Sequence, residues 1–301
     1  MNKNLKSGLL FGLSAYFLWG ILPIYWKQLY HISSFEILAN RFIWSSVFAF
    51  ALILASGQFG VFYDDCKFIL ASKKRTIALI CAAITMIVNW GVFIWAINSD
   101  QILASSMGYY INPLVSVLFG MLFLKEILTS RQIAAVAFAF LGTAVMVWQF
   151  GKLPWISLAL AISFAVYGLI KKQLPISPLT SIALESSLVM PFAIIYEYYM
   201  SANGGVYHNI QASDLLLLIG GGIVTAIPLM LFTAAVKRLP LKVVGFLQYV
   251  SPTITLLIGV FIYKEVFSST HLTAFGCIWI GIIIFSLPNR SNRDGIERDN
   301  G

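Results

Sequence analysis

Apolar residues in this chain fall into ten long runs that are separated by short polar connections. The runs lie near 7–26, 35–55, 76–97, 102–124, 130–149, 154–170, 180–199, 214–236, 243–263 and 270–287. Each is continuously apolar over about the 20 residues that a helix needs to cross a bilayer, whereas a barrel strand alternates apolar and polar positions over about ten residues. The pattern therefore predicts an all-α membrane protein with ten transmembrane helices.

The composition agrees with a membrane protein and leaves no room for a separate soluble domain. Of the 301 residues, 59% are hydrophobic and 11% are charged, whereas a soluble domain carries roughly 25% charged residues. The mean hydropathy is +0.85. Ten crossings and their connections use nearly the whole chain. Only the polar stretch 289–301 lies beyond the last run, and we expect it to be a disordered cytoplasmic tail.

The basic residues predict how the chain is oriented. If the N-terminus is cytoplasmic, about sixteen of the twenty Lys and Arg residues lie on the cytoplasmic side, and Lys27, Lys152 and Lys264 lie outside. This excess is the pattern that orients membrane proteins, and it predicts that both termini are cytoplasmic. We therefore interpret the net charge of +8 as an orientation signal and expect no nucleic-acid partner.

The two halves of the chain repeat each other. A shift of 139 positions aligns Tyr110, Pro113, Gly120, Lys125, Glu126, Ser130 and Gly142 with Tyr249, Pro252, Gly259, Lys264, Glu265, Ser269 and Gly281. Each half holds five runs, and an odd number of crossings inverts the second copy in the membrane. The prediction is two inverted repeats, residues 1–150 and 151–288. Secondary transporters have this architecture, and their halves alternate access to a central site.

Two repeat-related prolines lie near the middle of the membrane. Pro113 and Pro252 cannot donate to the carbonyls four residues earlier, and helices broken at this depth are where transporters bind substrate. The alternative is that the prolines only kink helices for packing. With polar and aromatic residues of other runs, they give a set of candidate cavity residues that suits a flat, amphipathic or aromatic solute. The set is Tyr16, Trp19, Asn89, Trp95, Tyr109, Tyr110, Asn112, Pro113, Tyr167, Gln248, Tyr249 and Pro252.

Charged residues inside apolar runs are costly and are therefore functional candidates. Four residues within or at the edge of the runs are the candidates, Glu36, Arg41, Lys171 and Glu185. Glu185 is the best candidate for a carboxylate that exchanges a proton for solute, and a fixed ion pair is the alternative. Lys171 lies near the end of its run, where a long side chain can reach the interface. Arg41 and Glu185 enter the membrane from opposite sides, so we do not expect them to meet.

The sequence offers no motif for catalysis or for a cofactor. It lacks G-x-x-x-x-G-K-[ST], H-E-x-x-H and G-x-S-x-G. Its histidines and cysteines have no metal-ligand spacing. We therefore expect a transporter with no cofactor, no metal and no catalytic residue. An integral-membrane enzyme that acts on lipid or acyl groups and a non-transporting membrane scaffold are the alternatives.

Four segments resemble a known family of membrane proteins. They are AYFLWGILPIYWKQL from Ala15, FEILANRFIWS from Phe35, GYYINPLVSVLFGMLFLKE from Gly108 and GFLQYVSPTITLLIGVFIYKE from Gly245. All are similar to the RarD subfamily of EamA-type drug/metabolite transporters.

The resemblance implies a ten-helix permease of the bacterial inner membrane, built from two inverted EamA repeats. Its partners are a small organic metabolite or drug, the bilayer and, if the carboxylate titrates, protons. The resemblance also implies an association with chloramphenicol. It does not predict an oligomeric state. The family often has His where this chain has Asn40, so we expect no role at this position that requires protonation.

Overall fold

The computed structural model describes residues 3–98, 102–151, 155–264 and 269–287, and within these ranges it contains helices and no strand. Ten helical segments of the described residues are long and apolar enough to cross a membrane. The all-α class and the ten predicted spans are thereby confirmed.

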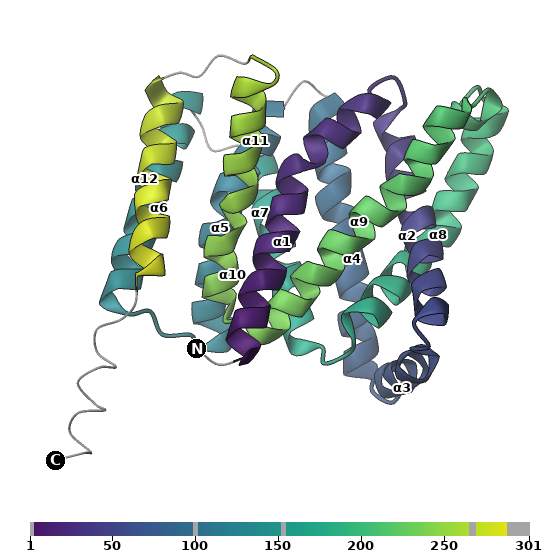
Figure 1. Cartoon of the computed structure of the whole chain (residues 1–301), viewed down its shortest axis with the longest axis horizontal. Helices are drawn as coiled ribbons and strands as arrows, with labels where there is room; N and C mark the ends of the chain where they lie inside the picture. The colour runs from purple at the N-terminus through teal and green to yellow at the C-terminus, as the bar shows by residue number, and fades with distance from the viewer. Residues whose placement is uncertain (1–2, 99–101, 152–154, 265–268, 288–301) are drawn as a thin grey trace. The chain divides into compact units, whose positions relative to one another are not determined.

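The helices are shown in Figure 1. In chain order they are α1 Lys3–Trp26, η1 Lys27–Leu29, α2 Ser34–Ala55, α3 Phe59–Leu70, α4 Lys73–Asn98, α5 Ile102–Leu124, α6 Ser130–Phe150, α7 Trp155–Gln173, α8 Pro178–Ala202, η2 Val206–His208, α9 Ala212–Arg238, α10 Leu241–Gln248, α11 Val250–Phe261 and α12 Ser269–Ser286.

Spatial contacts divide the chain into two compact units. The larger unit comprises 1–126 and 153–266, and the smaller unit comprises 127–152 and 267–301. The smaller unit pairs α6 with α12, the last span of each half of the sequence. The division into repeats at residue 150 stays a prediction, and so does the disorder of 289–301, which lies outside the described residues.

Two glycines bring α6 and α12 into close contact. An added Cβ at Gly142 would lie 2.5 Å from the carbonyl oxygen of Ala274, and one at Gly281 would lie 2.8 Å from that of Ala135. Small residues let helix backbones approach in this way. The two glycines are equivalent in the repeat, and the two alanines are equivalent too. The contact therefore has local twofold symmetry.

The repeated lysines Lys125 and Lys264 follow the ends of helices, and Glu126 also contacts the start of another helix. Lys125, after α5, and Lys264, after α11, both have left-handed backbone, with φ of 54° and 57°, a conformation that residues other than glycine rarely adopt. The Glu126 carboxylate then accepts hydrogen bonds from the amides of Leu241 at 2.6 Å and Lys242 at 2.9 Å. An anion at these free amides stabilises the start of α10.

The repeat-equivalent helices α5 and α10–α11 run antiparallel, as inverted repeats require. Glu126, just beyond the end of α5, contacts the start of α10. Near the middle, the Tyr249 hydroxyl donates to the Tyr110 carbonyl at 3.4 Å. These two tyrosines are themselves repeat equivalents. The local twofold axis that relates the two helices therefore passes close to them.

The two repeat-related prolines have different effects on their helices. The span that contains Pro252 is broken, since α10 ends at Gln248 and α11 begins at Val250. The break falls where the proline cannot bond the carbonyl of Gln248. Pro113 lies inside α5, which remains one helix. An added Cβ at Gly245 would lie 2.8 Å from the Pro113 carbonyl oxygen, so α10 packs tightly against α5 at this point.

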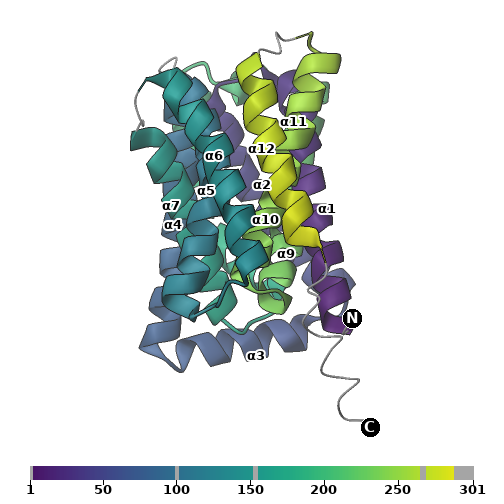
Figure 2. The ribbon, with the colours of Figure 1, turned by 90° about the vertical axis from the view of Figure 1, so that its left-hand side faces the viewer.

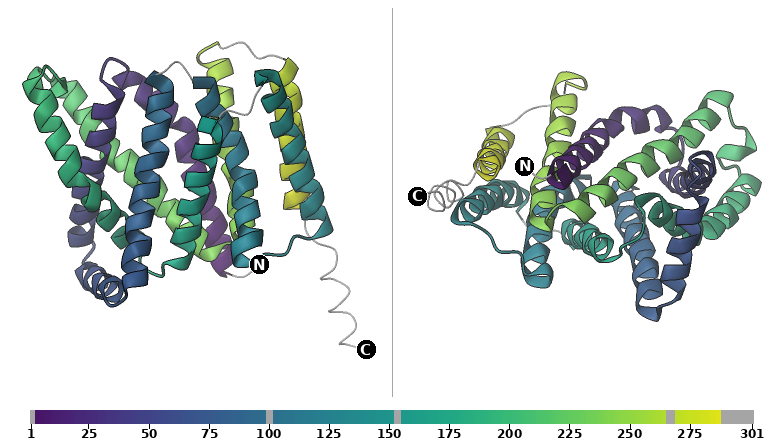
Figure 3. Two further views of the ribbon diagram at one scale, coloured as in Figure 1. Left: turned by 180° about the vertical axis from the view of Figure 1, so that it is seen from behind. Right: turned by 60° about the horizontal axis from the view of Figure 1, so that its bottom comes forward.

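The structure adds one helix that the sequence analysis did not predict. α3 has 12 residues, too few to cross a membrane, and it lies across the ends of the long helices of its unit (Figure 2). Figure 3 shows it at the same end of the unit as the start of α1. Phe59, Tyr63 and Leu70 are exposed while Ile69 is buried. Exposed Asp64 and Lys67 accompany these apolar side chains, and a short helix with both exposed apolar and exposed charged residues is typical of the membrane interface.

We expect Gly142→Ala and Gly281→Ala each to destabilise the protein. The new methyl group must push a backbone carbonyl away, which costs about 1–3 kcal/mol for an overpacked contact. Thermal unfolding in detergent measures the loss as a lower midpoint. The matched control is Gly276→Ala on α12, where an added Cβ meets no atom within 4 Å. An equal effect of all three substitutions would contradict the close packing.

Candidate solute-binding site

A buried ion pair joins α7 to α8 inside the larger unit. The Lys171 ammonium contacts Glu185 Oε1 and donates to the Ser181 hydroxyl at 2.6 Å. The Ser181 hydroxyl also donates to Glu185 Oε1 at 3.0 Å, and the Tyr167 hydroxyl donates to Oε2 at 3.1 Å. Both carboxylate oxygens therefore have hydrogen-bond donors, which a buried ion pair needs in order to offset its desolvation.

The suggestion that Lys171 reaches the membrane interface is wrong. Its side chain is 0% exposed, and that of Glu185 is 8% exposed. Lys171 turns inward because Ser181 and Glu185 stand one helical turn apart on α8 and both bind its ammonium. The fixed ion pair, which was the alternative for Glu185, is the arrangement that the structure contains.

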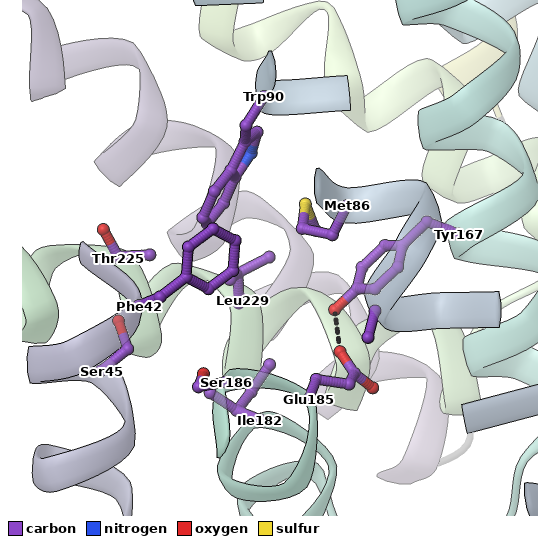
Figure 4. Close-up of a pocket in the computed structure, with 11 residues that line it drawn as sticks. Phe42, Ser45, Met86, Trp90, Tyr167, Ile182, Glu185, Ser186, Thr225 and Leu229 are labelled. Atoms are coloured by element: carbon purple, nitrogen blue, oxygen red, sulfur yellow. Dashed lines mark hydrogen bonds between the residues drawn. The ribbon is translucent and has the colours of Figure 1, made fainter. Parts of the chain in front are cut away.

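The ion pair borders a small cavity between α2, α4, α7, α8 and α9 (Figure 4). The cavity measures about 20 Å³, which is room for a water molecule, whereas sites for organic solutes measure about 300 Å³ or more. The surrounding helices must therefore separate before a solute can enter. Its walls are Phe42, Ser45, Ala83, Met86, Trp90, Tyr167, Ile182, Glu185, Ser186, Thr225 and Leu229.

Arg41 lies beside this cavity and makes no ion pair with a described residue. Its Nε donates to the Thr225 hydroxyl at 3.0 Å. Its guanidinium carbon lies 3.9 Å from the centre of the Trp90 ring and 4.9 Å from that of Trp26. Thr225 and Trp90 are also walls of the cavity. Arg41 and Glu185 thus approach one region from different helices without contacting each other.

Asn40 organises a second polar cluster between α2, α8 and η2. Its amide nitrogen donates to Glu197 Oε1 at 3.0 Å, and its oxygen accepts from the Tyr207 hydroxyl and from Trp44. Burial raises the pKa of Tyr207, which keeps this hydroxyl protonated as a donor. Glu36 accepts a hydrogen bond from the Val206 amide at 2.6 Å. The position where the family often has His therefore serves as a neutral bridge between helices.

The sequence analysis missed Glu197 in this cluster. Glu197 is 6% exposed, and its Oε2 is buried with no partner among the described residues. It lies inside the apolar run 180–199. An acid within an apolar run is the signal that identifies such a residue.

Several aromatic candidates pack in the core of the larger unit. Tyr16 and Tyr167 are 2% and 1% exposed. Trp19 lies 5.4 Å from Tyr16 and 5.7 Å from Phe232, between ring centres. The Tyr167 and Phe232 rings are stacked at 6.0 Å. In this conformation the cluster packs as hydrophobic core, and of its members only Tyr167 borders the cavity.

The amide candidates connect α4, α5, α7 and α10. Asn89 donates to the Leu160 carbonyl and to the Ser163 hydroxyl, both at 2.9 Å. Asn112 donates to the Ala161 carbonyl at 3.3 Å. The Ser116 hydroxyl lies 3.2 Å from the Asn112 side-chain oxygen and 3.5 Å from that of Gln248. These hydrogen bonds form one polar layer beside the broken span.

Two other candidates lie away from the cavity. Trp95 is 42% exposed and packs against Trp155 at 5.3 Å, and Tyr109 is 52% exposed and packs against Phe93 at 6.0 Å. The structure therefore places Tyr167 beside the Lys171–Glu185 ion pair. It places Asn112 near Gln248 of α10, with Ser116 between them. Whether these residues bind solute stays a prediction.

Comparisons with known proteins agree with a transporter. The model of the EamA-like transporter family matches residues 6–148 and 153–287. An uncharacterized transporter, YojE of Bacillus subtilis, is 40% identical over 93% of this chain and 94% of its own length. Protein RarD of Salmonella typhi is 40% identical over 94% of this chain and 95% of its own length.

Two further comparisons are more distant. The chloramphenicol-sensitive protein RarD of Pseudomonas aeruginosa is 28% identical over 92% of this chain and 93% of its own length. A crystal structure of a protein that is 19% identical covers 93% of this chain and 97% of that chain with a TM-score of 0.72. At that identity the likeness shows a shared fold alone.

We expect single substitutions of the buried ion pair to cost more than removal of both charges. Lys171→Met and Glu185→Leu each leave an uncompensated buried charge, which costs about 3–5 kcal/mol. The double variant should lose less free energy of unfolding than either single variant, and therefore less than the sum of the two losses. Unfolding in mixed micelles measures the three free energies of unfolding.

The control for this cycle is His31→Gln, which removes the pair of His31 with Asp214. That histidine side chain is 45% exposed, so the loss should stay below about 1 kcal/mol. Strictly additive losses for Lys171 and Glu185 would show that the two charges do not compensate each other.

Proposed function

Because the chain belongs to the EamA-like transporter family, which matches both of its halves, and to its RarD subfamily, we propose that it exports small organic metabolites or drugs by alternating access. The family membership inferred from the sequence is confirmed. The ten spans and the bacterial relatives identify a multi-pass protein of the inner membrane. The proposal extends this to the direction of transport, the class of solute and the mechanism.

One observation carries the proposal: a buried ion pair borders a water-sized cavity where five helices meet. A stable structural core has no need of ionised groups, because apolar residues of similar size are often as stable there. Groups of this kind in a membrane interior are characteristic of solute and proton pathways. The cavity is too small for an organic solute, so binding accompanies a change in helix packing.

The inverted repeats supply the motion. If the two halves exchange conformations, the cavity opens to one side of the membrane and then to the other. The broken span at Gln248 and the close approach of Gly245 to Pro113 are where such an exchange would bend the chain. The distribution of basic residues supports cytoplasmic termini.

Glu185 is the proposed proton carrier. In this conformation it is bound by the ammonium of Lys171 and by two hydroxyls. When the cavity opens and fills with water, the carboxylate is no longer sealed from solvent, so a proton can reach it and be carried. Chloramphenicol, which appears in the name of one relative, is the first solute to test.

We expect liposomes that contain the protein to move a labelled solute, chosen from chloramphenicol and a panel of metabolites, when a pH gradient is imposed. Pro113→Ala, Pro252→Ala and Gln248→Ala should reduce the transport rate more than tenfold without loss of folded protein. The matched control is Pro191→Ala, which changes an exposed proline inside α8. Normal transport by all three variants would remove these residues from the site.

Glu185→Gln tests the coupling separately. We expect solute exchange to continue while the response to the pH gradient disappears, because the amide cannot carry the proton. An unchanged response would exclude Glu185 as the carrier. If no solute in the panel moves under any gradient, the transport proposal itself loses its support and the membrane-scaffold alternative is favoured.

A further inference from the structure

The guanidinium of Arg41 has unused hydrogen-bond donors. Its Nε is bound to the Thr225 hydroxyl, but among the described residues none accepts a hydrogen bond from either Nη. The residue is partly exposed, and its Nη atoms are not among the buried polar atoms that lack a partner. The Nη donors of Arg41 are therefore free to bind a ligand, as far as the described residues show.

Arg41 also lacks a negative partner. Within the described residues no carboxylate lies within 4.0 Å of its nitrogens. Three buried acids of the same unit are bound elsewhere, since Glu36 accepts from the Val206 amide, Glu185 pairs with Lys171, and Glu197 accepts from Asn40 through Oε1. Arginine stays protonated in proteins, and an unpaired charge at membrane depth is costly. Among the described residues, the Arg41 charge meets two aromatic rings and one hydroxyl but no carboxylate.

The aromatic rings beside Arg41 define the shape of that partner. The guanidinium carbon lies over the Trp90 ring and over the Trp26 ring, and Trp90 is held by Phe42 at 5.1 Å between ring centres. A guanidinium stacked on aromatic rings keeps its donors at its edge, where a carboxylate can accept two parallel hydrogen bonds. The same rings offer flat apolar surface next to that position.

We propose that Arg41 binds the carboxylate of an aromatic or amphipathic organic acid, whose apolar body lies against Trp26 and Trp90 on the side of the cavity. This inference rests on the proposed function, because a transported solute is what reaches a site between α1, α2, α4 and α9. It narrows the solute class to organic anions. Thr225, which accepts from Nε and also lines the cavity, is a positioning residue that holds the guanidinium beside it.

The test compares acids with amides of the same size and shape, which lack the negative charge and the second acceptor oxygen. The full chain is purified in dodecyl maltoside, which carries no phosphate that could occupy the site in place of a solute. Calorimetry measures the binding of benzoate against benzamide and of indole-3-acetate against indole-3-acetamide. At least one acid should bind tenfold or more tightly than its amide. The absence of any preference in both pairs would overturn the proposal.

Three variants assign the preference to Arg41. Arg41→Gln should abolish it, and Arg41→Lys should keep part of it, because a lysine retains the charge but cannot form the bidentate contact. The matched control is Lys27→Gln, which removes an exposed cation that lies 3.4 Å from the centre of the Tyr263 ring. This control should bind as the native chain does. If Arg41→Gln folds and still binds the acid more tightly than its amide, the proposal is overturned.

Transport separates this inference from the function on which it rests. If the protein moves a neutral or cationic solute and Arg41→Gln moves it equally well, the organic-anion inference fails and the transporter stands. If the acid binds through Arg41 but no solute crosses the liposome membrane, the binding site stands and the transport function fails.

Discussion

The hydrocarbon interior of a membrane contains no water to satisfy polar groups, so each buried donor, acceptor and charge must find its partner within the protein or in a ligand. The spans are helical for this reason, and the one break in a span, at Tyr249, follows from a proline. Where a helix begins at α10, Glu126 supplies an acceptor for its first amides. The same requirement explains why Lys171 and Glu185 share hydrogen bonds with Ser181 and Tyr167, and why Arg41, which has no carboxylate partner among the described residues, is the place where we propose that a ligand binds.

The repeats can be read in contacts as well as in the sequence. Gly142 and Gly281 exchange equivalent contacts between α6 and α12, and Tyr249 reaches its own equivalent, Tyr110, across the middle of two antiparallel helices. Contacts between equivalent positions are the places where two inverted copies can trade conformations without new partners. Membrane transporters use such pairs because each state then resembles the other with the halves exchanged.

Apolar runs were sufficient to predict the ten spans, and the repeated proline marked where one of them breaks. The rest depended on information that a linear pattern does not hold. α3 is short and contains Asp64, Asp65 and Lys67, so it looked like a polar connection. Lys171 stands near the end of its run, but only the packing of α7 on α8 decides that it faces inward. The pairing of Lys171 with Glu185 cannot be derived from spacing, nor can the lack of a described acid beside Arg41, because each depends on which helices become neighbours.

The helix α3 distinguishes the first half of the described chain from the second. In the first half, α3 joins α2 to α4 and accepts a hydrogen bond from Ser177 through Asp65 at 2.8 Å. In the second half, α8 and α9 are joined by a short connection with only the single turn η2. Two identical halves would have two end conformations of equal free energy, and the protein would rest equally in both. A helix attached to one half alone would remove this degeneracy, so under the proposed exchange one end conformation would be favoured. Lipids in contact with the exposed Phe59, Tyr63 and Leu70 of α3 would then help to set which one.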